Sequence, residues 1–260
     1  MSYKTFIYIS LGLTFGILSG ACAENGPAVT SEQIQTERRH ALVRQVERHV
    51  LETAAWLGRK KLDPRVIAAL AATPRHEFVP PSLIDWAYED RPLPIGADQT
   101  ISQPYIVAIM TDLLELDDDC HVLDVGTGSG YQAAILAELC SQVWSIEIIP
   151  SLGHTAADKL ARLGYTNIEV RIGDGFAGWP EHAPFDGIIV AATGDELPPP
   201  LLAQLKPGGR IVMPLRNRAG GETLVVAYKQ PDGRILTTDI LPVRFVPLTR
   251  GKTDDPEVTD

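Results

Sequence analysis

The chain has 260 residues, 45% of them hydrophobic and 22% charged, which is enough for one sizeable globular domain with additions. Its formal net charge of −10 argues against a nucleic acid or an anionic membrane surface as the main partner. The 3 cysteines have no paired spacing and the 6 histidines are scattered, so we expect no metal site.

Residues 1–23 have the pattern of a secretory signal peptide. Phe6–Leu18 is an apolar run, and Ala21-Cys22-Ala23 matches the small-x-small cleavage pattern. Because the run is shorter than the ~20 residues of a membrane-spanning helix, we predict cleavage after Ala23, export and a periplasmic location, with no membrane span. A lipid anchor at Cys22 is the alternative, although the leucine usual in lipoprotein signals stands one position off.

Residues 24–36 are predicted to form a flexible tail, followed by one domain over residues 37–252 and a C-terminal tail at 253–260. Apolar residues already fall at helical spacing over 31–57, and Asp63-Pro64 starts a second helix over 65–72. We expect both helices to belong to an N-terminal helical and substrate-binding part, residues 37–116, that caps a sheet. That part continues with a proline-dense, restrained loop at 75–95 and an amphipathic helix at 106–116.

Strands alternate with helices in the second part of the domain, residues 117–252. The expected strands are 122–126, 143–148, 168–172, 185–191 and 209–214, and the expected helices are 131–137, 152–163 and 199–205. This alternation predicts an α/β fold with a doubly wound, mostly parallel sheet. Two further strands, 223–229 and 235–246, flank Pro231-Asp232-Gly233 and predict an antiparallel hairpin at the end.

The stretch Val122–Ala134 predicts a ligand site. A buried strand is followed by Gly126-Thr127-Gly128-Ser129-Gly130 and a helix, with Ser129 as candidate N-cap, so backbone N–H groups face a ligand at the sheet's carboxyl end. The third glycine comes too early for a dinucleotide fingerprint, and no Lys-Ser/Thr pair follows as in a P-loop. We therefore predict S-adenosylmethionine, which has no phosphates, in preference to a turn that binds nothing.

Three acids stand at strand ends around this loop. Glu147, about twenty residues beyond the loop, is expected to accept hydrogen bonds from both ribose hydroxyls. Asp174 is a candidate acceptor for the adenine amino group. Asp124 is predicted to bind the cofactor's ammonium group directly or through water, with capping of the glycine turn as the alternative. The predicted cofactor site is Asp124, Gly126, Thr127, Gly128, Ser129, Gly130, Glu147, Asp174 and Gly175.

Two further features leave alternatives open. In Thr100–Pro104, short hydroxyl and amide groups before a helix suit an anionic substrate, but Ser102 can equally be the helix cap. Cys120 and Cys140 fall at the same, amino-terminal edge of the sheet, where an oxidising compartment permits a disulfide. Two buried free thiols are the interpretation we favour.

Several segments together resemble the protein-L-isoaspartate (D-aspartate) O-methyltransferase family, over residues 37–252. They are Arg75–Pro80, PLPIGADQTISQPYIVAIMTDLLEL (92–116), VLDVGTGSGYQAAILA (122–137), Gly173-Asp174-Gly175, PFDGIIVAA (184–192), LKPGGRIVMPL (205–215) and VRFVPLTRGK (243–252). Many methyltransferases share the glycine loop, whereas the PIG…QTISQPY block and the VRFVPL tail are far narrower.

The resemblance implies a seven-stranded, S-adenosylmethionine-dependent fold that esterifies the free α-carboxylate of L-isoaspartyl and D-aspartyl residues in damaged proteins. The ester then collapses to a succinimide, which initiates repair. By position, the resemblance gives Ser102 the catalytic role. It places the isoaspartyl group at Thr100, Ile101, Gln103, Val243, Arg244, Phe245 and Val246.

This chemistry agrees with the residues present. A carboxylate is already ionised at neutral pH, so the site has to orient it towards the methyl group and exclude water, without a strong base. We expect Ser102 to orient the carboxylate and the chain to act as a monomer on isoaspartyl peptides and proteins. The alternatives are a methyltransferase for another carboxylate and a non-catalytic binder of damaged peptides.

Overall fold

The structure is a computed structural model that describes residues 30–250. No helix in this part of the chain is long and apolar enough to cross a membrane. The predicted signal peptide, Cys22 and the C-terminal tail at 253–260 lie outside the described residues, as do residues 24–29 of the predicted N-terminal tail.

Three helices form an N-terminal cap: α1 (Ser31–Glu52), α2 (Ala54–Leu57) and α3 (Pro64–Ala72). The side chain of Thr30 and that of Gln33 form a capping box at the start of α1. Residues 31–36 are therefore helical, and the prediction that the flexible tail extends to residue 36 is wrong. The predicted helix over 31–57 is interrupted at Thr53, whose hydroxyl donates to the backbone carbonyl of His49.

Along the chain, this cap is followed by two short 3-10 helices, a β-hairpin and a further helix, before the large sheet begins. They are η1 (Arg75–Phe78), η2 (Pro81–Trp86), β1 (Leu93–Gly96), β2 (Gln99–Ile101) and α4 (Pro104–Leu113). The hairpin turns through Ala97 and Asp98, whose φ angles are 50° and 56°. Left-handed alanine is uncommon, so Ala97-Asp98 is not a recognisable hairpin turn in the sequence.

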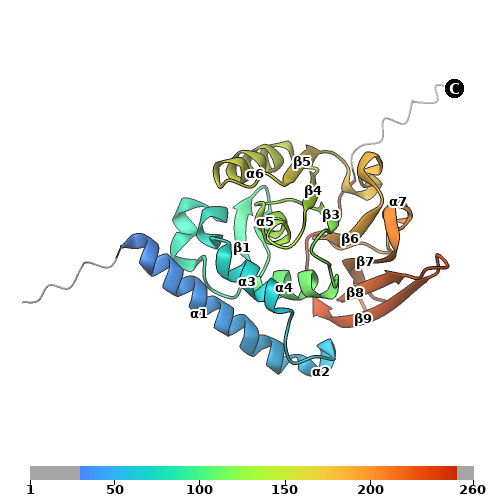
Figure 1. Cartoon of the computed structure of the whole chain (residues 1–260), viewed down its shortest axis with the longest axis horizontal. Helices are drawn as coiled ribbons and strands as arrows, with labels where there is room; N and C mark the ends of the chain where they lie inside the picture. Colours follow the sequence, from blue (N-terminus) through green and yellow to red (C-terminus); the bar gives the residue numbers. More distant parts are fainter. Residues whose placement is uncertain (1–29, 251–260) are drawn as a thin grey trace, which may run out of the picture.

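The large sheet has seven strands in the order β5-β4-β3-β6-β7-β8-β9 (Figure 1). The strands are β3 (His121–Val125), β4 (Gln142–Glu147), β5 (Ile168–Ile172), β6 (Phe185–Val190), β7 (Leu205–Arg216), β8 (Glu222–Lys229) and β9 (Ile235–Val243). β3 to β7 pair in parallel, and β8 and β9 add an antiparallel hairpin. The predicted doubly wound, mostly parallel sheet with a C-terminal hairpin is confirmed.

Helices cover both faces of this sheet, and each face has its own apolar core. The connecting elements are α5 (Tyr131–Ala137), α6 (Pro150–Arg162), η3 (Gly175–Ala177), η4 (Pro180–His182) and α7 (Pro199–Gln204). Val122 and Val143 pack on the face covered by α1, α3, α4 and α5, whereas Leu123 and Ile188 pack towards α7 (Figure 1). Strand order reverses between β3 and β6, which in such sheets places a ligand crevice at their carboxyl ends.

Cys120 and Cys140 form a disulfide, so the free thiols that we favoured from the sequence are wrong. Cys120 precedes β3 and Cys140 follows α5, and their Cα atoms are 4.7 Å apart, within the usual range for a bridge. Neither burial nor a shared sheet edge distinguishes free thiols from a disulfide, whereas the short distance between the two Cα atoms permits the bridge. The bridge closes the unit that carries the glycine loop.

Candidate active site

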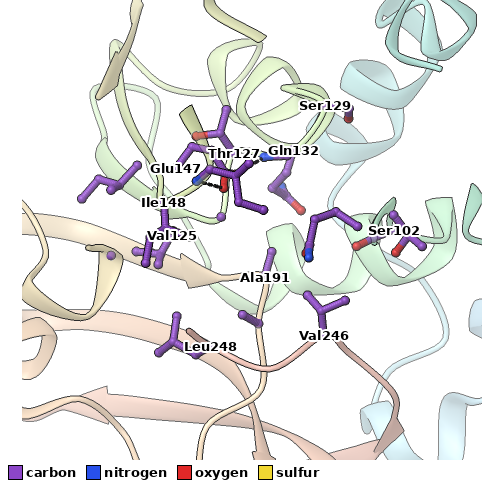
Figure 2. A pocket seen from close by; sticks show the side chains of 18 of the residues that line it. Ser102, Val125, Thr127, Ser129, Gln132, Glu147, Ile148, Ala191, Val246 and Leu248 are labelled. Atoms are coloured by element: carbon purple, nitrogen blue, oxygen red, sulfur yellow. Dashed lines mark hydrogen bonds between the residues drawn. The ribbon is translucent and has the colours of Figure 1, made fainter. Parts of the chain in front are cut away.

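A cleft opens at the carboxyl ends of β3, β4 and β6, where the strand order reverses. Including the solvent at its mouth, the cleft encloses about 830 Å³. Figure 2 shows its walls: Glu147 ends β4 and Ile148 follows it on one side, Ser102 precedes α4 on the other, and Ala191 lies between them. The segment with Val246 and Leu248 closes the cleft from below.

The glycine loop contributes Gly126, Thr127, Gly128 and Ser129 to the wall of this cleft. Gly126 and Gly128 have φ angles of 96° and 53°, which favour glycine over residues with a Cβ. Gly130 does not line the cleft, because it caps α5, and a Cβ there would stand 3.3 Å from Leu160. The N-cap is therefore Gly130 and not Ser129.

Glu147 lies where the sequence places it, buried at the end of β4. Its Oε2 accepts a hydrogen bond from Gly128 N at 2.7 Å, and its Oε1 accepts one from Ile149 N at 2.9 Å. Each carboxylate oxygen has a second lone pair, so the group can still accept two hydroxyls. Its two backbone bonds hold it in place at the cleft, as a ribose ligand requires.

Asp124 is fully buried and does not line the cleft. Ser145 Oγ donates to its Oδ2 at 2.8 Å, and the hydroxyl of Thr127 lies 2.6 Å from that of Ser145. Burial raises the pKa of Asp124 to about 7. Asp124 therefore does not line the cleft and makes no capping bond to the glycine turn. Its predicted binding of the cofactor's ammonium group through water stays a prediction.

The third acid, Asp174, does not line the cleft, whereas its neighbour Gly175 does. Asp174 accepts a hydrogen bond from Phe176 N at 2.9 Å and lies 3.7 Å from Arg250 Nε, whose guanidinium covers the Phe176 ring. The adenine role of Asp174 stays a prediction. A Cβ at Gly175 would lie 2.4 Å from Val125 Cγ1, so close packing demands glycine there.

A second groove adjoins the cleft and shares Thr100, Ser102, Ala191 and Val246 with it. The remaining predicted substrate residues Gln103, Val243, Arg244 and Phe245 line this groove, whereas Ile101 lines the cleft. The N-cap of α4 is Gln103, so Ser102 is not the helix cap. Ser102 therefore stands at the junction of the two cavities.

The chain after β9 is anchored so that it reaches this junction. Thr193 N donates to Val246 O at 2.8 Å, and Leu248 N donates to Thr193 O at 2.8 Å. The sequence reasoning missed the contributions of Ala191 and of residues 247–249 to the cleft. The position of Ala191 at the carboxyl end of β6 was a usable signal, but the return of the tail across the strand ends was not visible in the pattern.

The family model described as Protein-L-isoaspartate(D-aspartate) O-methyltransferase (PCMT) matches residues 44–253. The chain belongs to this family. The resemblance seen in the sequence is thereby confirmed. "Protein-L-isoaspartate O-methyltransferase 2" of Syntrophobacter fumaroxidans is 52% identical over 242 residues, which cover 93% of this chain and 98% of the relative. "Protein-L-isoaspartate O-methyltransferase 1" of Cupriavidus necator is 51% identical over 211 residues, covering 81% and 82%.

Solved structures of the same family share this fold. One protein-L-isoaspartate O-methyltransferase superposes with a TM-score of 0.71 at 28% identity, covering 80% of this chain and 65% of that one. A Plasmodium falciparum protein described as a putative family member, in complex with S-adenosyl-L-homocysteine, gives a TM-score of 0.68 at 21% identity. It covers 84% of this chain and 99% of its own, and at that identity it supports the fold alone.

Proposed function

We propose that this chain methylates the free α-carboxylate of L-isoaspartyl and D-aspartyl residues in damaged proteins, and so initiates their repair. The observation that carries the proposal is the position of Ser102, at the junction of the glycine-loop cleft and the groove formed with Val243–Val246. As a member of its family, the chain is an S-adenosylmethionine-dependent methyltransferase.

The residues of the cleft fit the cofactor. Gly126 and Gly128 line the cleft at the end of β3 without side chains, the Glu147 carboxylate is held there for the ribose hydroxyls, and Gly175 adds a further part of the wall without a side chain. When bound, S-adenosylmethionine supplies a methyl group on a positively charged sulfur. Thr127 and Ser129 also line this wall, although the Thr127 hydroxyl is bonded to Ser145.

The substrate carboxylate needs no general base, because it is ionised at neutral pH. The task of the protein is therefore to orient one carboxylate oxygen and to exclude water. Ser102 is suited to orient it through its hydroxyl, and the Gln103 amide lies in the same groove. The apolar side chains of Ile101 and Val246 line the cleft beside Ser102 and are suited to exclude water.

The test is transfer of a labelled methyl group to an isoaspartyl peptide and to its normal aspartyl twin. Base-labile label on the isoaspartyl peptide alone, strongly reduced in Ser102→Ala, is the expected result. Ser141→Ala is the matched control, because that hydroxyl bonds to Cys120 O, far from the cleft. Label on both peptides favours a methyltransferase for other carboxylates, and cofactor binding without any turnover favours a binding protein; either contradicts the proposal.

We also propose that the protein is exported, with residues 1–23 as a signal cleaved after Ala23 and the periplasm as its location. The signal-like sequence and the Cys120–Cys140 disulfide support this, because disulfides persist in oxidising compartments. N-terminal sequencing of the protein from the periplasmic fraction is expected to begin at Glu24. A lipid-modified Cys22 in the membrane fraction supports the anchored alternative, and an uncleaved cytoplasmic chain refutes export.

We further propose that the chain acts as a monomer. Light scattering coupled to size-exclusion chromatography is expected to give the mass of one chain, and the mass of a dimer at assay concentrations contradicts this.

A further inference from the structure

Asp90, between η2 and β1, is a buried carboxylate whose side chain is 2% exposed. Its Oδ1 accepts a hydrogen bond from Tyr105 N at 2.8 Å, and its Oδ2 accepts one from Gln103 Nε2 at 3.2 Å. Both donors belong to the start of α4, directly after Ser102. His49 Nδ1 of α1 lies 3.0 Å from Oδ2, and its ring stacks on that of Tyr105 at 4.0 Å. One carboxylate thus ties α1 to the first turn of α4.

A buried cation holds the other side of the same segment. Arg75 is fully buried, and its Nη2 donates to the backbone carbonyl of Ser102 at 2.8 Å, while its Nε donates to Ala87 O at 3.0 Å. The guanidinium lies 4.8 Å from the ring centroid of Tyr131, which begins α5 after the glycine loop and lines the cleft. Arg75 therefore connects the backbone of Ser102 to the cofactor loop.

These charges do more than satisfy a helix end. Gln103 makes no side-chain cap, so the Tyr105 N–H at the second position of α4 depends on Asp90 from another segment. An ionised carboxylate only accepts hydrogen bonds, so it holds the amide of Gln103 with its NH₂ group towards Asp90. The oxygen Oε1 of Gln103 is then the atom left for other partners in the groove.

We propose that Asp90 is a positioning residue for methyl transfer: it fixes Gln103 and the first turn of α4, while Arg75 fixes the carbonyl of Ser102. The segment that orients the substrate is thereby held between two buried charges of opposite sign. This inference rests on the proposed function. A displacement of about 1 Å in such a segment is enough to cost ~100-fold in rate.

Asp112 offers a matched control at the opposite end of α4. Its side chain is also 2% exposed, its Oδ1 accepts from Asp63 N at 2.6 Å, and its Oδ2 accepts from Arg59 Nη1 at 2.7 Å. Asp112→Ala therefore removes a carboxylate of the same kind, bonded to a backbone N–H and a cationic side chain, without touching the Ser102 segment.

The experiment measures kcat and KM for an isoaspartyl peptide, and the Kd of S-adenosylhomocysteine, in the full chain. Asp90→Ala is expected to lower kcat/KM by about 10-fold or more, with the Kd of S-adenosylhomocysteine changed less than about 3-fold. Asp112→Ala is expected to change both by less than about 3-fold. Asp90→Asn keeps an oxygen that can accept from Tyr105 N–H, so this variant is expected to recover part of kcat. It is measured in place of Asp90→Ala if the alanine variant does not fold.

Two results overturn the inference: kcat/KM near the wild-type value in the Asp90 variants, or an equal loss in Asp112→Ala. A second measurement separates the inference from the proposed function. Hydrogen exchange over residues 99–107 is expected to be faster in the Asp90 variants than in wild type and unchanged in Asp112→Ala. If wild type fails to methylate the peptide, the proposed function fails, but the exchange data still decide whether Asp90 holds this segment. Unchanged exchange in the Asp90 variants shows that it does not.

Discussion

Removal of the Cys120–Cys140 disulfide is expected to destabilise the protein by about 3 kcal/mol. The bridge joins residues with a sequence separation of 20, and the chain-entropy relation for a loop of that length gives about 3 kcal/mol at 25 °C. In a domain of this size each kcal/mol corresponds to roughly 2–4 °C, so we expect Tm to fall by about 6–12 °C. The closed segment contains β3, the glycine loop and α5, the unit on which the cleft depends.

The assay is thermal unfolding of the oxidised protein, the reduced protein and the double variant Cys120→Ala, Cys140→Ala. Reduced wild type and the double variant are expected to unfold at similar temperatures, both below the oxidised form. Reductant added to the double variant is the control and should leave its Tm unchanged. Peptide mapping after alkylation establishes that the purified wild type carries the bridge.

Equal Tm values for oxidised and reduced wild type would refute the entropic reasoning. Two alkylated thiols in protein purified from an oxidising compartment would contradict the bridge itself. These outcomes are distinguishable, because the first concerns the energy of the cross-link and the second its existence.

Three further predictions concern Glu147, Asp124 and Arg244. Glu147→Gln removes the charge from the ribose acceptor and is expected to weaken S-adenosylhomocysteine binding by ~10-fold or more in calorimetry; unchanged affinity contradicts that role. Burial raises the pKa of Asp124 from 3.8 to about 7, so the native state keeps a proton that the unfolded chain releases. The free energy of unfolding, measured with urea, should therefore fall as pH rises from about 4 to about 7, and it should fall less in Asp124→Asn. If it falls equally with pH in both proteins, another group is responsible. Arg244 is exposed in the groove. Arg244→Glu is therefore expected to raise KM for an anionic isoaspartyl peptide by about 3- to 10-fold without changing cofactor affinity. An unchanged KM would place the peptide outside this groove.

Local sequence signals predicted the elements around the cofactor loop well. The helix Tyr131–Ala137 and the strand Ile168–Ile172 have the predicted bounds, and the alternation of strands and helices was sufficient for the sheet. These features depend on apolar periodicity and on glycine within a few residues, which a single sequence displays. Glu147 was predictable for the same reason, since its place is set by its own strand.

Long-range contacts explain what the sequence did not predict. Asp124 lies one residue before the end of β3, whereas Glu147 is the last residue of β4. Asp124 pairs with Ser145 of the neighbouring strand, whose hydroxyl donates to it behind the loop. The predicted adenine acceptor Asp174 faces Arg250, a residue from the far end of the chain. A one-strand pattern cannot specify a partner on another strand or on a returning tail, so only the fold distinguishes these acids.

The distribution of buried charge follows from the reaction. An acceptor that is ionised before it binds needs no proton removed, so most of the rate enhancement must come from orientation and from exclusion of water. Orientation by a single hydroxyl is weak unless its backbone is fixed, and the loop that carries Ser102 has no cap of its own. Arg75 and Asp90 supply that constraint from two other segments, and Arg75 extends it to the first residue of α5. The groups that hold the reactive segment, rather than any that exchange protons, are therefore where substitutions should most affect turnover.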